Sequence, residues 1–136
     1  MKVVIDANVF VSAAIQRGPS RRIVDAWLAG DSFGVVACPR LLAEVREVLT
    51  KRPRLRRWIE LPVAELFVDR LAATLELVPD PGDVAGHTRD PGDDYLITLA
   101  RLNRAAFIVS GDRDLIEWKP QRPPVITPAA FADLIL

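Results

Sequence analysis

Met-Lys-Val-Val-Ile-Asp, residues 1–6, opens the chain with a short run of mostly β-branched residues that ends in an acid. A run of this kind, without polar alternation, is typical of a strand buried in a parallel sheet. Residues 33–38 and 106–110 have the same character. Segments with apolar residues at helical spacing lie between these runs. This alternation predicts an α/β fold in which helices cover both faces of a parallel sheet.

The remaining elements are expected from apolar spacing and from the positions of proline and glycine. We expect helices over residues 21–29, 62–77, 93–103 and 128–136, and a further helix that begins at Pro39. A single helical turn is expected over residues 115–118, and a short last strand over residues 123–127. Residues 79–92 are rich in Pro, Gly and Asp, which predicts an irregular loop.

The composition indicates one globular domain, residues 1–136, in a reducing compartment. Lys plus Arg and Asp plus Glu number 18 each, and this balance argues against a purely electrostatic nucleic-acid binder. Cys38 is the one cysteine, so no intrachain disulfide can form, and we expect it to be a small buried hydrophobe. No signal peptide or membrane-spanning stretch is evident, so the expected location is cytoplasmic and no membrane partner is expected.

Acidic residues stand where the expected strands end and helices begin. In α/β sheets the functional crevice lies beyond the carboxyl ends of the strands, and Asp6 and Asp112 follow two of these strands. Glu44 lies near the start of the helix that begins at Pro39, and Asp94 heads the apolar pattern of residues 93–103. Converging carboxylates without His or Cys suit Mg²⁺ or Mn²⁺, and such an ion supports phosphodiester hydrolysis.

Each acid also has an ordinary structural explanation. Asp6 fits a helix N-cap, Glu44 fits a solvated helix acid, and one of Asp112 and Asp114 fits the cap of a short helix. Glu47 competes with Glu44, which we prefer because it lies nearer the strand end. Asp93 and Asp90 compete with Asp94, which we prefer because it directly heads the helical apolar pattern. Gathered carboxylates raise one another's pKa, and a divalent cation removes that cost. The group therefore indicates a metal more strongly than any member does.

Four blocks of this sequence resemble those of PIN-domain ribonucleases, and the resemblance covers nearly the whole chain. The blocks are Asp6-Ala-Asn-Val, Glu44 in its helix, Asp94-Tyr-Leu-Ile-Thr-Leu-Ala, and Val109-Ser-Gly-Asp-Arg-Asp-Leu. The similarity is greatest to prokaryotic PIN-domain toxins of toxin–antitoxin pairs. It implies a three-layer α/β/α fold with a mostly parallel sheet of about four to five strands. It also implies a Mg²⁺- or Mn²⁺-dependent endoribonuclease that cleaves single-stranded RNA, a cognate antitoxin partner and a homodimer.

The resemblance also assigns the site residues. It implies that Asp6, Glu44, Asp94 and Asp112 are catalytic, that Asp114 is a further metal-binding acid, and that Asn8 and Ser110 support the pocket. Our mechanistic hypothesis is that Asp6, Asp94 and Asp112 bind one or two cations directly, with Glu44 and Asp114 close by. A metal-activated water then attacks the phosphodiester, without a nucleophile from the protein.

An RNA substrate needs a basic track beside the acidic pocket. The candidates for phosphate contact are Lys51, Arg52, Arg54, Arg56 and Arg57. A second cluster is formed by Arg17, Arg21 and Arg22, and both clusters could instead be ordinary surface. Trp58 could stack on a base, although packing is the commoner role of a lone Trp.

Two other functions fit parts of the pattern. A phosphatase with an aspartate nucleophile would carry Asp two residues after the first acid, where this chain has Asn8. A catalytically silent PIN-like module that binds protein or RNA would be expected to have lost some of the acids. His87, the one histidine, lies in the expected loop, where a surface position is more plausible than a role as general acid.

Overall fold

A five-stranded parallel sheet forms the centre of the computed structural model, which describes residues 1–30, 33–82, 91–119 and 121–136. The side chains of residues 91–93 are outside the description as well. The strands run in the order β3-β2-β1-β4-β5. Their bounds are β1 Lys2–Ile5, β2 Gly34–Ala37, β3 Glu76–Leu77, β4 Phe107–Val109 and β5 Val125–Ile126. His87 and Asp90 lie outside the described residues.

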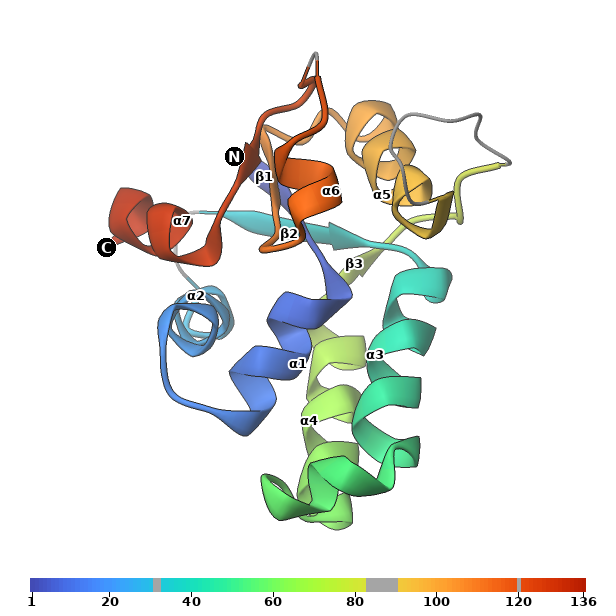
Figure 1. Ribbon diagram of the computed structural model, residues 1–136, viewed down its shortest axis with the longest axis vertical. Helices are drawn as coiled ribbons and strands as arrows, with labels where there is room; N and C mark the ends of the chain where they lie inside the picture. Colours follow the sequence, from blue (N-terminus) through green and yellow to red (C-terminus); the bar gives the residue numbers. More distant parts are fainter. Residues whose placement is uncertain (31–32, 83–90, 120) are drawn as a thin grey trace.

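Seven α-helices accompany the sheet in the described part of the chain. Their bounds are α1 Ala7–Ile15, α2 Pro19–Leu28, α3 Pro39–Lys51, α4 Leu61–Thr74, α5 Pro91–Leu102, α6 Arg113–Ile116 and α7 Pro128–Ile135, and a 3₁₀ helix, η1, spans Pro53–Arg57. Figure 1 shows α1 to α4 on one side of the sheet and α5 on the other. The predicted three-layer α/β/α fold with a parallel sheet is thus confirmed.

The register of the two central strands brings two separate chain segments to the same edge. Ile5 at the end of β1 pairs with Val109 at the end of β4, and the backbone N–H of Asp6 donates to Val109 O at 3.0 Å. Asp6 and Ser110 therefore leave the sheet side by side, at the carboxyl end of adjacent strands. This is the edge at which parallel sheets place functional groups.

The sequence prediction missed α1, and the burial of this helix explains why. Five of its nine residues are buried: Ala7, Val9, Phe10, Val11 and Ala13. A helix that is apolar nearly all round shows no amphipathic stripe, so apolar periodicity cannot reveal it. Its start is nevertheless marked by Asp6, whose carboxylate accepts from the backbone N–H of Asn8 as an N-cap.

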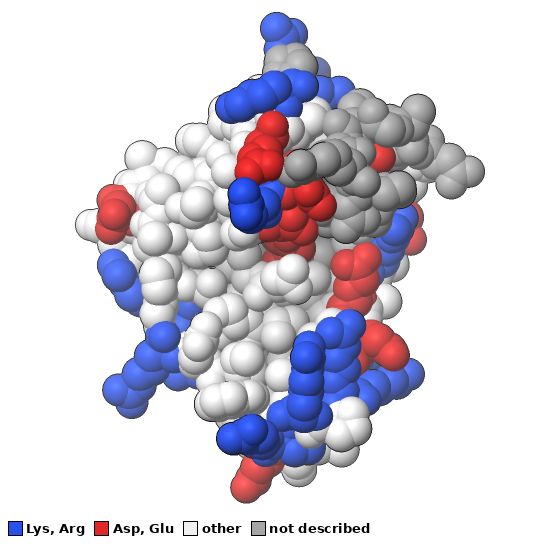
Figure 2. All heavy atoms as spheres, viewed as in Figure 1, with Lys and Arg blue, Asp and Glu red and all other residues white. Residues whose placement is uncertain are grey.

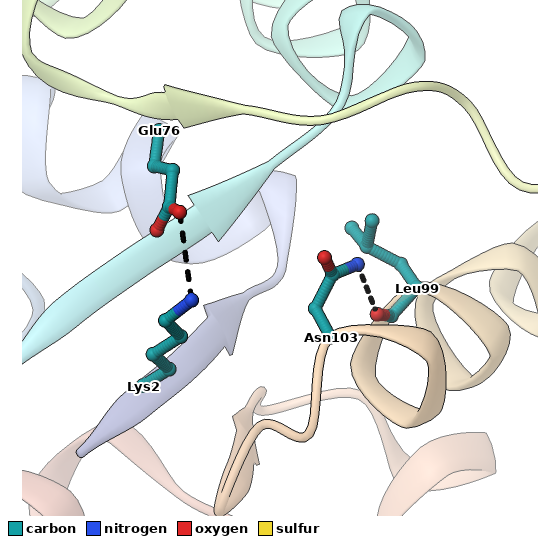
Figure 3. Close-up of polar contacts among 4 residues, drawn as sticks. All are labelled: Lys2, Glu76, Leu99 and Asn103. Atoms are coloured by element: carbon teal, nitrogen blue, oxygen red, sulfur yellow. Dashed lines mark hydrogen bonds and ion pairs between the residues drawn. The ribbon is translucent and has the colours of Figure 1, made fainter.

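The prediction of one helix over residues 62–77 was wrong at its end. Helix α4 ends at Thr74, and residues 76–77 form the edge strand β3 beside β2. Both residues of β3 are exposed, so hydrophobic patterning could not identify it. Figure 3 shows Lys2 of β1 beside Glu76 of β3; their ion pair measures 3.5 Å.

Helix ends follow from ordinary capping. Proline occupies the first turn of α2, α3, α4 and α7, where its missing N–H costs nothing. At the end of α5 the side chain of Asn103 donates to Leu99 O at 2.9 Å (Figure 3), and Arg104 then takes a positive φ of 55°. Cys38 is fully buried, as expected. The longest helix in the described ranges, α4, has 14 residues, and none has the length and hydropathy needed to cross a membrane.

Candidate functional site

Asp6 is a buried carboxylate held by two hydrogen bonds, and 5% of its surface is exposed. Its Oδ2 accepts from the hydroxyl of Ser110 at 2.8 Å, and its Oδ1 accepts from the backbone N–H of Asn8 at 3.5 Å. Burial raises the pKa of Asp6 above its ordinary value, and the charge of Asp112 raises it further. The bonds from Ser110 and Asn8 act in the opposite direction, although burial prevails.

Ser110 connects the acids that follow the two central strands. While it donates to Asp6, its hydroxyl oxygen accepts from the backbone N–H of Asp112 at 3.0 Å. Asp112 in turn caps α6, because its Oδ1 accepts from the backbone N–H of Asp114 at 2.8 Å. The capping explanation for Asp112 is therefore correct, and it does not exclude a site role, since Asp112 also borders a pocket at this edge of the sheet.

The pocket beside Asp6 and Asp112 has a volume of about 620 Å³. It is lined by Asp6, Ala7, Asn8, Arg40, Ala43, Glu44, Glu47, Val48, Arg52 and Asp112. Four of these residues are acidic and two are arginines, so the lining has a net negative charge with two guanidinium groups beside the acids. Figure 2 shows acidic groups beside α6, near the start of α1, and Lys and Arg toward the lower end of α3.

Glu44 reaches the pocket from α3 and is held by two neighbours. Nε of Arg40, one turn earlier, lies 3.7 Å from its Oε1. The guanidinium carbon of Arg40 also lies 4.1 Å from the centre of the Tyr95 ring, a cation–π arrangement. Partial burial raises the pKa of Glu44, whereas the Tyr95 hydroxyl and Arg40 lower it. Glu47, the competing acid, lines the pocket too and pairs with Lys51 at 3.3 Å.

The Tyr95 hydroxyl is buried under the pocket. Burial raises the pKa of Tyr95 well above its usual range, and the charge of Glu44 raises it further. Although the hydroxyl is close enough to Glu44 to influence it, it forms no hydrogen bond of good geometry within the described residues. Tyr95 therefore places the start of α5 next to the acidic pocket.

Asp94 and Asp114 take less direct positions. Asp94 is 2% exposed on α5, next to Tyr95, and the residue has an interaction partner. Asp114 is partly buried on α6, also with an interaction partner. Neither residue lines the pocket that contains Asp6 and Asp112. The side chain of Asp93 is outside the described part, so the choice between Asp93 and Asp94 stays a prediction.

The donor set suits a hard cation, although the described residues do not form a complete binding site. Among them, no three acidic, histidine or cysteine side chains gather closely enough to hold one metal ion together. The charge of Asp112 nevertheless raises the pKa of Asp6, and both residues offer carboxylate oxygen, the donor that Mg²⁺ and Mn²⁺ prefer. A cation beside Asp6 would offset the burial and repulsion that raise its pKa. The residues present therefore fit such an ion.

The basic segment divides into side chains with different roles. Arg52 lines the acidic pocket, whereas Arg56 donates to Leu49 O near the end of α3 and is partly buried there. Arg54 is exposed, and the guanidinium of Arg57 lies 5.7 Å from the ring centre of Trp58. Lys51 is held by its ion pair with Glu47. Of the two roles considered for Trp58, packing in the core does not apply, because 61% of its surface is exposed; base stacking stays a prediction.

The second basic cluster is partly structural. Arg21 donates to Ala13 O at 2.9 Å and to Ala14 O at 3.3 Å, so its guanidinium satisfies carbonyls at the end of α1. Arg17 and Arg22 are exposed.

The sequence reasoning overlooked Arg40 and Tyr95. Arg40 carries a local signal, because it stands four residues before Glu44 on the same helix face. Tyr95 directly follows Asp94, but its place under the pocket depends on how α5 packs against β1 and β4, which no local pattern specifies.

Comparison with known proteins agrees with the fold. A sequence model of the PIN domain matches residues 2–114. The uncharacterised protein MJ1680 of Methanocaldococcus jannaschii is 28% identical over 122 residues, which cover 89% of this chain and 77% of that protein. The crystal structure of PAE2754 from Pyrobaculum aerophilum is similar with a TM-score of 0.68 at 14% identity, over 99% of this chain and 89% of that one. The crystal structure of VapBC2 from Rickettsia felis, bound to a DNA fragment from its promoter, is similar with a TM-score of 0.64 at 11% identity, over 93% of this chain and 98% of that one.

Proposed function

The chain belongs to the PIN-domain family, and we propose that it is a divalent-cation-dependent endoribonuclease that cleaves single-stranded RNA. One observation carries the proposal: Ser110 joins Asp6 to the backbone of Asp112 at the carboxyl end of two adjacent strands. The pocket there combines these acids with Arg40 and Arg52. Acids that hold a cation and arginines that hold phosphate are the two requirements of metal-assisted phosphodiester hydrolysis.

Asp6 and Asp112 would hold Mg²⁺ or Mn²⁺, and Asp94, Glu44 and Asp114 are the further acids that the family resemblance assigns. When bound, such an ion supplies a water of lowered pKa and offsets charge on the phosphate. Ser110 fixes the carboxylate of Asp6 through its hydrogen bond, so that this ligand is oriented before the ion arrives.

Arg40 and Arg52 would bind the RNA backbone on the α3 side of the pocket. A guanidinium can donate two parallel hydrogen bonds to one phosphate, which fixes both position and orientation. Glu44 and the Tyr95 ring hold Arg40 at the pocket wall, so it is partly oriented before substrate binds. Arg54 and Arg57, which are exposed on η1, extend the basic surface away from the pocket.

We propose further that the protein is the toxin of a toxin–antitoxin pair in the cytoplasm and forms a homodimer. The similarity to VapBC2, which was solved on its promoter DNA, supports a partner of the antitoxin kind. Exposed apolar side chains supply candidate contact surfaces: Trp58, Leu61, Val63 and Leu66 at η1 and α4, and Leu134 and Leu136 at the chain end. Light scattering after size exclusion tests the dimer, and the gene next to this one tests the partner.

The test is cleavage of an end-labelled single-stranded RNA in Mg²⁺, Mn²⁺ or EDTA. We expect cleavage with either cation, none in EDTA, and a loss of about 100-fold or more in Asp6→Asn and Asp112→Asn, since each removes a charged ligand. Asp133→Asn, an exposed carboxylate on α7, is the matched control and should cleave like the unmodified protein. Mn²⁺ should also raise the unfolding temperature of the unmodified protein but not of Asp6→Asn.

The same experiment separates the alternatives. Cleavage that persists in EDTA, or in Asp6→Asn and Asp112→Asn, would contradict the proposal. A protein that binds RNA or a partner without cleavage in any cation would be the silent binding module. Turnover of a small phosphoester with a trapped aspartyl-phosphate would indicate the phosphatase, which Asn8 in place of a second Asp disfavours.

A further inference from the structure

A second hollow adjoins the acidic pocket and shares Asn8 and Asp112 with it. Its volume is about 320 Å³. Among the described residues, the lining is Asn8, Val9, Ser12, Ser20, Gly111, Asp112 and Pro128. These residues come from α1, α2, the turn after β4 and the start of α7. Four separate chain segments thus build a concave surface next to the candidate cleavage site.

Ser20 is the unusual member of this lining. Its residue is 8% exposed, yet its hydroxyl makes no hydrogen bond to any described residue. The hydroxyl does not cap α2 either, because Gly18 holds that position and no side chain donates or accepts there. By contrast, the hydroxyl of Ser12 accepts from Gln16 at 3.0 Å. The Ser20 oxygen is not among the fully enclosed polar atoms that lack a partner in the described part of the chain, so it stays accessible from the hollow. A ligand hydroxyl there could form a hydrogen bond with it.

The chemistry of the lining restricts the ligand. Its described residues include one carboxylate, Asp112, and no Lys or Arg, so a phosphate would meet repulsion that no cation of this lining offsets. None of the lining residues that the structure describes has an aromatic ring on which a base could stack. Hydroxyl and amide groups remain, from Ser12, Ser20 and Asn8. A neutral group that carries hydroxyls, such as a sugar, matches them because a hydroxyl both donates and accepts.

We propose that this hollow binds the ribose of the nucleotide next to the cleaved phosphate, and that Ser20 recognises its 2′-hydroxyl. This inference rests on the proposed ribonuclease function and adds the group by which RNA is distinguished from DNA. The 2′-hydroxyl is the group that allows such a distinction at a given nucleotide. Because the acidic pocket and the hollow share Asn8 and Asp112, a strand whose phosphate lies in the pocket can place its neighbouring ribose in the hollow.

The space at Gly111 agrees with an open ligand site. A Cβ built there would meet no atom within 4 Å, and its φ is not in the left-handed region. Gly111→Ala should therefore fold normally and reduce the room in the hollow by one methyl group. This gives a second variant that is independent of Ser20.

The experiment uses an RNA oligomer with a mapped cleavage position and a series in which one ribose at a time is replaced by 2′-deoxyribose. In the unmodified protein, one replacement next to the cleaved phosphate should lower kcat/KM by about 2- to 10-fold, the effect of one hydrogen bond. In Ser20→Ala the same replacement should have no effect. Thr74→Ala, which removes a hydroxyl from the exposed side of α4, should keep the full effect. Gly111→Ala should slow cleavage most when that ribose carries 2′-O-methyl.

A binding measurement separates this inference from the proposed function. In the Asp6→Asn background, the affinity ratio between the all-ribose oligomer and the oligomer with that single deoxyribose is measured with and without Ser20→Ala. A ratio above one that falls to one in Ser20→Ala supports the inference even if no cleavage is detected. Equal ratios in the two proteins, together with normal cleavage, would overturn the inference alone. If neither protein binds RNA, both proposals fail.

Discussion

The hydroxyl of Ser110 donates a 2.8 Å hydrogen bond to Oδ2 of Asp6, a residue 104 positions earlier in the chain. Ser110 is fully buried, and its oxygen also accepts from the backbone N–H of Asp112. Ser110→Ala removes a donor from a buried carboxylate and an acceptor from a backbone N–H. We expect the free energy of unfolding in EDTA to fall by about 1–3 kcal/mol. Mn²⁺ affinity should fall by about 10- to 100-fold, because the ligand loses its orientation.

Urea unfolding and Mn²⁺ titration measure these two effects. Thr74→Ala on the exposed side of α4 is the control for loss of a hydroxyl, and its stability should change by less than about 0.5 kcal/mol. Equal Mn²⁺ affinity in Ser110→Ala and the unmodified protein would show that the bond does not orient Asp6.

Asp6→Asn should stabilise the cation-free protein at neutral pH while it abolishes activity. Burial raises the pKa of Asp6 in the folded state, so folding favours the protonated carboxyl. Its contribution to stability is complete below the pKa of the unfolded chain and is lost as pH rises through the raised folded pKa. Asparagine does not titrate, and its amide can still donate to the Ser110 hydroxyl. The stability difference between Asp6→Asn and the unmodified protein should therefore grow from acidic to neutral pH.

Urea unfolding in EDTA at several pH values between 4 and 8 measures that difference. Comparison of the two proteins at each pH cancels the other titrating groups. If Asp6→Asn is the less stable protein at pH 7, the buried charge is not a cost, and a cation beside Asp6 has no burial penalty to offset.

The parts of the fold that were predicted correctly are those with a local signal. The apolar runs before Asp6 and Ser110 identified the two central strands, and Pro39 marked the start of α3. Helix α1 was missed because burial on all sides removes its periodicity, and β3 was missed because its two residues are exposed at the sheet edge. Elements of both kinds depend on the tertiary structure around them.

The candidate site shows the same division. Asp6 and Asp112 were predicted from their places after strands, and both line the pocket. Arg40 and Tyr95 were not predicted. The guanidinium of Arg40 on α3 contacts the ring of Tyr95 on α5 only in the folded protein, where these two helices are brought together. Ser20 was overlooked for a similar reason: an unpartnered hydroxyl can be recognised only when its surroundings are known.

Arg52→Ala should weaken RNA binding and its dependence on salt. Arg52 is the member of the basic segment that lines the acidic pocket, so its guanidinium is placed to contact one phosphate. Loss of one phosphate contact should reduce the slope of log affinity against log salt by about 0.7 for a single strand. Fluorescence anisotropy with labelled RNA, at several salt concentrations and in the Asp6→Asn background, measures this slope.

Arg70→Ala on α4 is the matched control, because Arg70 is exposed and does not line the pocket. If the two variants change the slope equally, Arg52 contributes general charge and no particular contact.

Cys38 should be protected from alkylation in the folded protein at ordinary pH. The residue is fully buried, and burial raises the pKa of its thiol to about 11. Because the thiolate is the reactive form, iodoacetamide at pH 8 should modify the native protein far more slowly than the urea-unfolded protein, whose thiol has a pKa of about 8.5. Protection should decrease as pH rises toward 11. Mass spectrometry after timed alkylation follows this, and equal rates in water and urea would contradict the buried position.

Phe131→Ala should show that α7 belongs to the folding unit, although the family match ends at residue 114. Phe131 is fully buried and meets Phe33 and Phe107 edge to face, with ring centres 5.3 Å and 6.2 Å apart. Its truncation leaves a cavity beneath the sheet and should lower the free energy of unfolding by about 3–5 kcal/mol. Leu134→Ala on the same helix is the control, because Leu134 is 57% exposed and should cost less than about 0.5 kcal/mol. If urea unfolding gives equal losses for the two variants, α7 is not anchored through Phe131, and the hollow that Pro128 helps to line loses its support.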